Sequence, residues 1–464
     1  MILATALLAA TYTTGSIDAD VRLYQTTAAR EFREIPTSEF TVHPYPATPA
    51  LDFDSAKELH EFVGLGAALT DSSAWILANM DPDRRAKLLR DLFTPEGCNL
   101  SVLRLNMGAS DYSTALYTYD DTPGDLGLKN FSLAHDDLWL VPMAKEIQRL
   151  RPDVRWYSAP WSPPGWMKTS GLMIGGELKE ECRGALAQYF VKYLQGYAER
   201  GIRISAVTPQ NEPLIDTDGT YPSCLYTAEQ ETRFVVDHLA PALKAAKLDT
   251  KIWIFDHNCE ADAIGRVKGQ LADEKMRAVV DGIAWHCYCP SSEAVNLRRV
   301  ADLHPELPFY HTENGPHLLI ERTEWWWAEK VFGMLQNGCR IFTAWNLCLD
   351  ENGMPLTGPH QCAGFTVVDS ATQEVTHSPQ YNLFRHLGPF VRRGARVLGI
   401  EGSRDGTRLI AFRNPNGEYV LVVACDGSPV KDIQRHRLVI KHKGAYKTLP
   451  LPAGKWSIST LVFK

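Results

Sequence analysis

The 464-residue sequence lacks the patterns that would assign it to several specialised classes. Its ten cysteines include no CxxC pair and the chain is far too long for a disulfide scaffold, so we expect mostly reduced, buried thiols. Its net charge of −7 offers no basic face and argues against a nucleic-acid partner. Internal repeats and low-complexity tracts are also absent.

Long hydrophobic runs are absent as well. Residues 1–10 are apolar, but about ten residues cannot span a bilayer. This stretch resembles the core of a secretory signal peptide, but it has no basic residues before it. We therefore expect no integral membrane segment and a cytoplasmic location, with a secreted or periplasmic location as the alternative. Nothing in the sequence indicates the oligomeric state.

The chain does contain enough apolar material for a large core. With 45% apolar and 22% charged residues it has the composition of an ordinary soluble globular protein. Its length suits one large domain and a smaller one. Twelve tryptophans and 17 tyrosines are many for this length. Aromatic faces suit stacking on sugar rings, although we expect most of these rings in the core.

Strand-like runs alternate with helical runs from about residue 60 to residue 350. The expected strands are residues 62–70, 101–107, 154–160, 204–208, 251–256, 282–288, 308–312 and 340–346. The clearest helices are residues 82–93, 134–150, 178–200, 228–246 and 325–337. Eight strands that alternate with helices in this way predict an α/β fold, the closed (β/α)8 or TIM barrel.

An open, doubly wound sheet is the alternative arrangement of the same elements. Its dinucleotide-binding form carries a GxGxxG motif directly after the first strand. Here the glycines of Gly64-Leu65-Gly66-Ala67 lie within that strand instead. This difference favours the closed barrel.

The pattern changes after about residue 380. Short strand-like runs are separated by turns such as Asp405-Gly406 and Asn416-Gly417, which signal hairpins. These runs are residues 397–400, 408–413, 419–424, 437–440, 446–449 and 457–463. We expect them to form a β-sandwich together with N-terminal strands at residues 21–26 and 40–42. The predicted domains are therefore the barrel of residues 51–378 and a sandwich of residues 1–50 and 379–464.

The motif VTPQNEP, residues 207–213, places Glu212 at the tip of the fourth barrel strand. The strand must end here because Pro213 cannot donate to a strand ladder. The motif HTENG places Glu313 at the tip of the seventh strand, on roughly the opposite side of the ring. Such barrels carry their chemistry at these tips. Two carboxyl groups that flank a bond are what glycoside hydrolysis needs, one as acid and one as nucleophile or base.

Five motifs together resemble glycoside hydrolase family 30, the family of glucosylceramidases and related retaining β-glycosidases. They are SVLRLNMGASDYS, SAPWSPPGWMKTSG, VTPQNEP, HTENG and AWNL. Their order and spacing fit the family over most of the barrel. The resemblance implies a (β/α)8 barrel with a β-sandwich built from both termini, in agreement with the pattern of strands and helices.

The resemblance also implies roles for individual residues. Glu212 resembles the general acid/base and Glu313 the nucleophile. Asn211 would bind the sugar 2-hydroxyl, Tyr288 would hydrogen-bond the nucleophile, and Arg104 would keep it ionised. The other positions that match sugar-binding residues are Asp111, Trp161, His286 and Trp345.

The sequence departs from the family pattern at Cys287, where glucosylceramidases carry an aromatic residue, and at Asn314, where a small residue is more usual. A metal site from His286, Cys287 and Cys289 with Asp256 and His257 is not expected. Neighbouring strand residues point to opposite faces, and the chemistry needs no cofactor and no metal. We expect Trp325-Trp326-Trp327 to serve helix packing rather than sugar binding.

The sequence therefore predicts a retaining β-glycosidase that acts on a carbohydrate or glycoside by double displacement, with carboxyl groups about 5–5.5 Å apart. The pKa of Glu212 should be raised in the free enzyme, since this residue must first act as an acid. We expect exo action on β-glucosides or β-xylosides. The alternatives are an endo-β-glycanase such as a β-1,6-glucanase, a β-glucuronidase that uses Lys168 or a loop arginine, and a non-catalytic sugar-binding protein.

Overall fold

A computed structural model describes most of the chain. The described residues are 21–27, 32–36, 51–215, 219–320, 322–400, 406–427, 437–450 and 456–464. They divide into two compact units, one within residues 60–397 and one from the described parts of residues 1–59 and 398–464. The predicted domain boundaries after residues 50 and 378 stay predictions.

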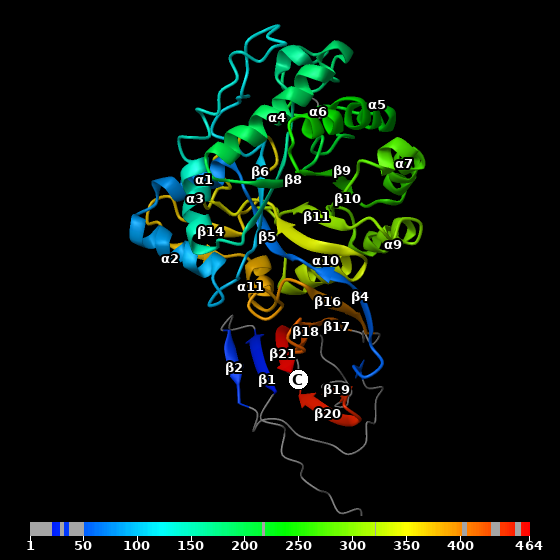
Figure 1. Cartoon of the computed structure of the whole chain (residues 1–464). Coiled ribbons are helices and arrows are strands. Elements are labelled where there is room, and N and C mark those ends of the chain that lie inside the picture. The colour runs from blue at the N-terminus through cyan, green and yellow to red at the C-terminus, as the bar shows by residue number, and fades with distance from the viewer. Residues whose placement is uncertain are drawn as a thin grey trace, which may run out of the picture. The chain divides into compact units, whose positions relative to one another are not determined.

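The larger unit is a closed barrel of eight parallel strands, in which β12 pairs with β5 to complete the ring (Figure 1). The strands are β5 (Gly64–Leu69), β6 (Val102–Asn106), β7 (Arg155–Ala159), β8 (Ile204–Val207), β9 (Lys251–Asn258), β10 (Gly282–His286), β11 (Phe309–Asn314) and β12 (Cys339–Ala344). Each of the eight predicted strands is present. The predicted (β/α)8 fold is therefore confirmed.

Helices surround this ring of strands (Figure 1). They are α1 (Asp71–Asn79), α2 (Pro82–Phe93), α3 (Leu140–Leu150), α4 (Arg183–Glu199), α5 (Ala228–Arg233), η4 (Phe234–Leu239), α6 (Ala240–Ala245), α7 (Ala261–Ala272), α8 (Glu274–Arg277), α9 (Asn296–Ala301), α10 (Glu324–Gln336) and α11 (Pro379–Arg385). None of the helices in the described ranges is both long and apolar enough to cross a membrane.

The helix ends follow local side-chain chemistry where a capping residue is present. The carboxylate of Asp81 accepts hydrogen bonds from the amides of Asp83 and Arg84, and α2 begins at the predicted residue. By contrast, α3 begins six residues later than predicted, and its N-cap Trp139 makes no side-chain capping bond. The predicted helix at residues 228–246 is α5 and α6 with the π-helical turn η4 between them.

The barrel interior is apolar at its N-terminal end and polar one layer further along. The apolar floor consists of Val63, Val102, Tyr157, Ala206, Trp253, Ala284, Tyr310 and Ile341. Two residues along the same face of their strands come Arg104, Thr208, His286, Thr312 and Thr343, all fully buried. The barrel is thus a packed core that carries a polar layer toward the C-terminal ends of its strands.

The strands of the smaller unit belong to two sheets. One has the order β2 (Arg33–Ile35), β1 (Arg22–Thr27), β21 (Trp456–Phe463), β18 (Tyr419–Asp426), β17 (Thr407–Arg413), β16 (Ala395–Gly399), β4 (Lys57–Phe62), and the other β20 (Ala445–Pro450), β19 (Arg437–His442), β3 (Leu51–Asp52). In the first sheet, β4 and β16 include residues on both sides of the unit boundary. Leu23, Leu421 and Leu461 from the first sheet share a core with Leu51 and Ile440 from the second. The N-terminal β1 pairs antiparallel with the C-terminal β21, as predicted. The strand predicted at residues 40–42 lies outside the described residues.

Gly66 permits the close approach of β5 and β6. A Cβ atom at this position would lie 2.0 Å from the carbonyl oxygen of Val102, which is backbone and cannot turn aside. We expect Gly66→Ala to lower the melting temperature by several degrees, because forcing a methyl group into a packed core costs about 1–3 kcal/mol. Gly265→Ala in α7 is the control, since its new methyl group meets open space and improves helix propensity. Thermal unfolding by circular dichroism compares the two, and equal melting temperatures would contradict the prediction.

Candidate active site

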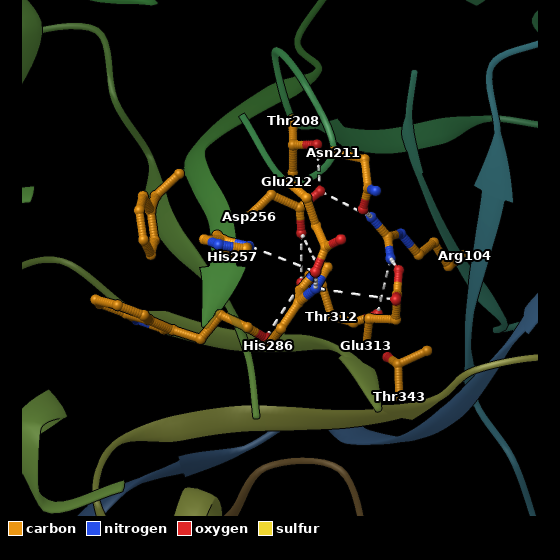
Figure 2. Close-up of polar contacts among 12 residues, drawn as sticks. Arg104, Thr208, Asn211, Glu212, Asp256, His257, His286, Thr312, Glu313 and Thr343 are labelled. Carbon is orange, nitrogen blue, oxygen red and sulfur yellow. Dashed lines mark hydrogen bonds and ion pairs between the residues drawn. The ribbon is translucent and has the colours of Figure 1, made fainter. Parts of the chain in front are cut away.

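The guanidinium of Arg104, on β6, is the hub of the polar layer (Figure 2). Its Nη1 donates a hydrogen bond to Oε2 of Glu313. Its Nη2 donates to Oδ1 of Asn211 and to Oδ2 of Asp256, both at 2.8 Å. Arg104 itself is fully buried. It therefore connects side chains from the ends of β8, β9 and β11.

Glu313 ends β11 with its carboxylate held from two sides. Besides Arg104, the hydroxyl of Tyr288 donates to its Oε1 at 3.0 Å. Burial raises the pKa of Glu313, opposed by the charges of His286 and Arg104 and supported by those of Glu212 and Asp256. The carboxyl group is thus fixed in position, as a nucleophile requires.

Glu212 lies just beyond β8 in a left-handed backbone conformation, with φ of 46°. Its backbone amide donates to the carbonyl of Asp256 at 3.0 Å. Its Oε1 lies 3.1 Å from Nδ1 of His286 and 3.4 Å from Nδ1 of His257. A non-glycine residue in this conformation stores strain, which is common at functional sites.

The expectation of a raised pKa for Glu212 is wrong for the free site. Burial favours the neutral carboxyl, but the neighbouring imidazoles of His257 and His286 outweigh it and hold the pKa of Glu212 below its usual range. Burial likewise opposes a charge on His286. The charge of Glu313 and the hydrogen bonds to Asp256 and Glu212 nevertheless raise the pKa of His286 to about 10. The sequence did not indicate that an imidazolium faces Glu212.

The two glutamate carboxylates lie close together because they share His286 as a neighbour. Its Nδ1 is 3.1 Å from Oε1 of Glu212 and 3.9 Å from Oε1 of Glu313. The sum of these distances is the upper limit for the gap between the two oxygens. This limit lies below the roughly 9 Å at the wide end of the inverting range and above the spacing of about 5–5.5 Å in a retaining site, so it excludes only the widest inverting spacing.

Asp256 is the most connected site residue that sequence reasoning missed. Its carboxylate accepts hydrogen bonds from Arg104, His286, Thr312 and Thr208, at 2.5–3.1 Å. The pairing of β10 with β9 skips Asp256, which is the extra residue of a β-bulge with φ of 55°. The bulge breaks the alternation of strand side chains. The only available signal was a polar pair, Asp256-His257, at the end of an apolar strand.

The trio Glu212, His257 and His286 places its potential metal-ligand atoms within 4.8 Å of one another. His286 binds a metal only as the neutral imidazole, whereas its raised pKa favours the protonated form. The imidazole of His286 points to the carboxylates of Glu212 and Asp256, whereas the thiol of Cys287 lies with those of Cys259 and Cys289. The two side chains therefore face apart, as strand alternation predicts.

A cavity of about 370 Å³ opens over the two glutamates. The predicted residues that line it are Asp111, Trp161, Glu212, Tyr288, Glu313 and Trp345. Asn211, Arg104 and His286 are not among the residues that line it. Oδ1 of Asp111 is buried without a hydrogen-bond partner in the described parts of the chain, as expected of a group that awaits a ligand hydroxyl. Burial, with the charges of Glu313 and Glu212, raises the pKa of Asp111.

Other residues that line the cavity come from segments that sequence reasoning did not assign to the site. These segments contribute His317, Ile320, Arg322 and Trp326 after β11, His360 and Cys362 after β12, and Ile215, Tyr221 and Asn258 elsewhere. His317 and Cys362 form an antiparallel bridge that joins two of these segments.

The tryptophan run of α10 does not behave as one unit. Trp327 is fully buried, which confirms helix packing for this residue. Trp326 packs against Trp327 and also lines the cavity, with the guanidinium of Arg322 4.6 Å from its ring centre, and for this residue the prediction stays a prediction. Successive side chains of a helix point about 100° apart, and the sequence alone does not show which of them faces the cavity.

Two further sequence interpretations concern Lys168 and Asn314. The ammonium of Lys168 is buried and donates to Ser162 and to the carbonyls of Met173 and Ser223, so the guess that it reaches the sugar is wrong. The amide of Asn314 donates to the carbonyl of Cys287, which ties the ends of β10 and β11 together.

A closed (β/α)8 barrel that holds two carboxyl groups at strand tips, under a cavity lined by indole rings, defines a glycoside hydrolase. The comparison with protein families identifies which one. Residues 62–391 match the model of the glycosyl hydrolase family 30 TIM-barrel domain, and the chain belongs to this family.

The relatives of this chain include proteins named endo-1,6-β-glucanase and proteins named glucosylceramidase. An endo-1,6-β-D-glucanase of Neurospora crassa is 33% identical over 395 residues, which are 78% of this chain and 81% of the relative. The lysosomal acid glucosylceramidase of Mus musculus is 28% identical over 405 residues, 80% and 76% of the two chains. Among solved structures, the endo-β1,6-glucanase BT3312 superposes with a TM-score of 0.85 and 27% identity, over 96% of this chain and 99% of that one.

Asp256→Asn tests the contacts that Asp256 makes with Arg104 and His286. The substitution removes a charge that pairs with Arg104 and that raises the pKa of His286. We expect the pKa of His286 to fall, and stability to fall by about 3–5 kcal/mol because a buried pair is broken. NMR titration of the imidazole and chemical denaturation measure the two effects. Asp153→Asn is the control, since the side chain of Asp153 is 56% exposed and its ion pairs contribute little. An unshifted His286 titration would contradict the assignment.

Proposed function

We propose that the protein is a retaining endo-β-1,6-glucanase. The observation that carries this proposal is that Trp326, Arg322 and His360 line the same cavity as the two glutamates. The ring of Trp326 in this cavity offers a stacking surface for a further sugar unit, which an endo-acting enzyme must bind. The names of the relatives at 30–33% identity agree with it, since all three are endo-1,6-β-D-glucanases. The expected exo action on β-glucosides or β-xylosides has less support.

In the first step Glu313 attacks the anomeric carbon and Glu212 protonates the leaving oxygen. Arg104 and Tyr288 hold the two oxygens of Glu313, so the attacking carboxylate needs no reorganisation. In the second step Glu212 takes a proton from water, which attacks the glycosyl-enzyme and restores Glu313. Asn211, whose Oδ1 accepts a hydrogen bond from Arg104, keeps the proposed role of binding the 2-hydroxyl, although it is not among the residues that line the cavity.

The proton must move between the two carboxyl groups for this cycle to start. In the free site the pKa of Glu313 is raised and that of Glu212 is lowered, which is the reverse of what bond cleavage needs. Interacting carboxyl groups titrate as a pair, so one proton can be redistributed between them. A sugar with positive charge developing at its anomeric carbon favours an ionised Glu313. The proton then resides on Glu212, against the leaving oxygen.

Product length tests the proposed function. A linear β-1,6-glucan digested for a short time should release oligosaccharides of mixed length, and a panel of p-nitrophenyl β-glycosides should react slowly. Glucose as the sole early product would instead indicate an exo-glucosidase. Release from the glucuronide alone would favour the β-glucuronidase alternative, for which Arg322 is the cavity cation. Binding of the glucan without any hydrolysis would indicate a sugar-binding protein.

One substitution, with a matched control, tests the role of Glu313 as nucleophile. Glu313→Ala should reduce kcat by several orders of magnitude, because the covalent step is lost. It should also lower the melting temperature, because Arg104 loses one of its buried partners. Glu180→Ala is the control, since the side chain of Glu180 is 77% exposed, and it should keep full activity. Residual turnover of Glu313→Ala near the wild-type rate would contradict the role of nucleophile.

His257 should tune the acid. Its imidazole lowers the pKa of Glu212, so removal of the nitrogen in His257→Phe should raise that pKa. Glu212 then stays protonated to higher pH, and the basic limb of the kcat/KM profile should move upward. His257→Gln keeps a donor and should leave the limb near its wild-type position. A limb that does not move in His257→Phe would assign the basic limb to another group.

A further inference from the structure

Three cysteine thiols gather beside the part of the cavity wall that Asn258 and Tyr288 form. Cys259 follows β9, and Cys287 and Cys289 follow β10. The Sγ atoms of Cys259 and Cys289 are 3.5 Å apart, and the three Sγ atoms lie within 4.8 Å of one another. Cys259 and Cys287 are fully buried, and 4% of Cys289 is exposed. The glycosidase reaction uses none of these thiols.

A buried ammonium group accompanies the thiols. Nζ of Lys330, on α10, donates to the carbonyls of Cys287 and Cys289 and lies 3.8 Å from Sγ of Cys287. No carboxylate of the described residues forms an ion pair with it. A buried cation without a counter-ion is costly, so the surroundings favour a thiolate. Hydrogen bonds from Cys259 and Cys287, together with the charge of Lys330, lower the pKa of Cys289 despite its burial.

We propose that Cys259 and Cys289 are a redox-active pair, which a small hydroperoxide converts reversibly into a disulfide. The thiolate of Cys289, the more exposed of the two, attacks one peroxide oxygen. The O–O bond breaks, hydroxide leaves and Cys289 becomes a sulfenic acid. The thiol of Cys259 then attacks that sulfur, the S–S bond forms and water leaves. Two electrons pass from the two sulfurs to the peroxide, and a dithiol reductant reverses the change.

The bond would tie together two segments that form the site. The amide of Tyr288 donates to Oδ1 of Asn258 at 2.9 Å, and the hydroxyl of Tyr288 donates to Glu313. Closing the Sγ distance from 3.5 Å to about 2.05 Å requires only a small approach of these segments. The link also closes a loop between the ends of β9 and β10, which restricts the unfolded chain.

A metal ion is the competing occupant of a three-thiol cluster. Structural zinc sites take four ligands, whereas three potential ligand side chains gather here among the described residues. The ammonium of Lys330, 3.8 Å from Cys287 Sγ, also repels a cation. These two observations favour the disulfide.

The test treats the reduced full-length protein with stoichiometric hydrogen peroxide. Non-reducing peptide mapping should link the peptide of Cys259 to that of Cys289, and the intact mass should fall by two hydrogen atoms. The melting temperature should rise by about 5 °C and return on addition of dithiothreitol. Cys259→Ala and Cys289→Ala should abolish the link and the shift. Cys224→Ala, which removes a buried thiol elsewhere, should keep both.

Three outcomes would overturn the proposal. The first is a peroxide-treated protein that keeps all of its thiols. The second is conversion of Cys289 to a sulfinic acid without a link to Cys259. The third is an equivalent of zinc or copper in the purified protein that Cys259→Ala removes, which would make the cluster a metal site. If the cysteine variants fail to fold, peptide mapping of the oxidised wild-type protein still shows whether Cys259 and Cys289 are linked.

Discussion

The buried guanidinium of Arg104 is the interaction on which the rest of the site depends. Removing such a cation from water costs several kcal/mol unless its partners are close and well oriented. Here the partners are Asp256, Glu313 and Asn211, which reach it from the ends of three different strands. The rings of Trp161 and Trp345 cover it at 4.7 and 5.8 Å. The same bonds from the two Nη atoms of the buried cation therefore align Glu313 and Asn211, the neighbour of Glu212.

The charges around Arg104 do not balance, and this imbalance suits the proposed chemistry. Three carboxyl groups, on Glu212, Asp256 and Glu313, face two cations, Arg104 and the imidazolium of His286. One extra proton stabilises such a site. Small differences between the pKa values of the carboxyl groups decide which of them binds that proton. Substrate charge can then decide which glutamate carries it. Asp256 is unsuited to that role, because four donors stabilise its ionised form.

The barrel and the walls of the cavity contribute different properties. The apolar floor and the polar layer come from residues on and at the ends of the strands, and Arg104 of the polar layer holds the carboxylate of Glu313. The lining residues Trp326, Arg322 and His360 come from segments beyond the strands, which is where this fold commonly varies between proteins.

The sequence by itself determined the eight strands, the main helices and the positions of Glu212 and Glu313 at strand tips. These features depend on short-range patterns, such as alternating apolar residues and the proline after Glu212, which act within a few residues. Only the tertiary structure decided the position of Asp256, because a bulge turned it against the alternation of β9. It also decided that Trp326 faces the cavity, that Lys168 faces away, and that Cys259 meets Cys289. These positions depend on how distant segments pack, and no local pattern encodes that packing.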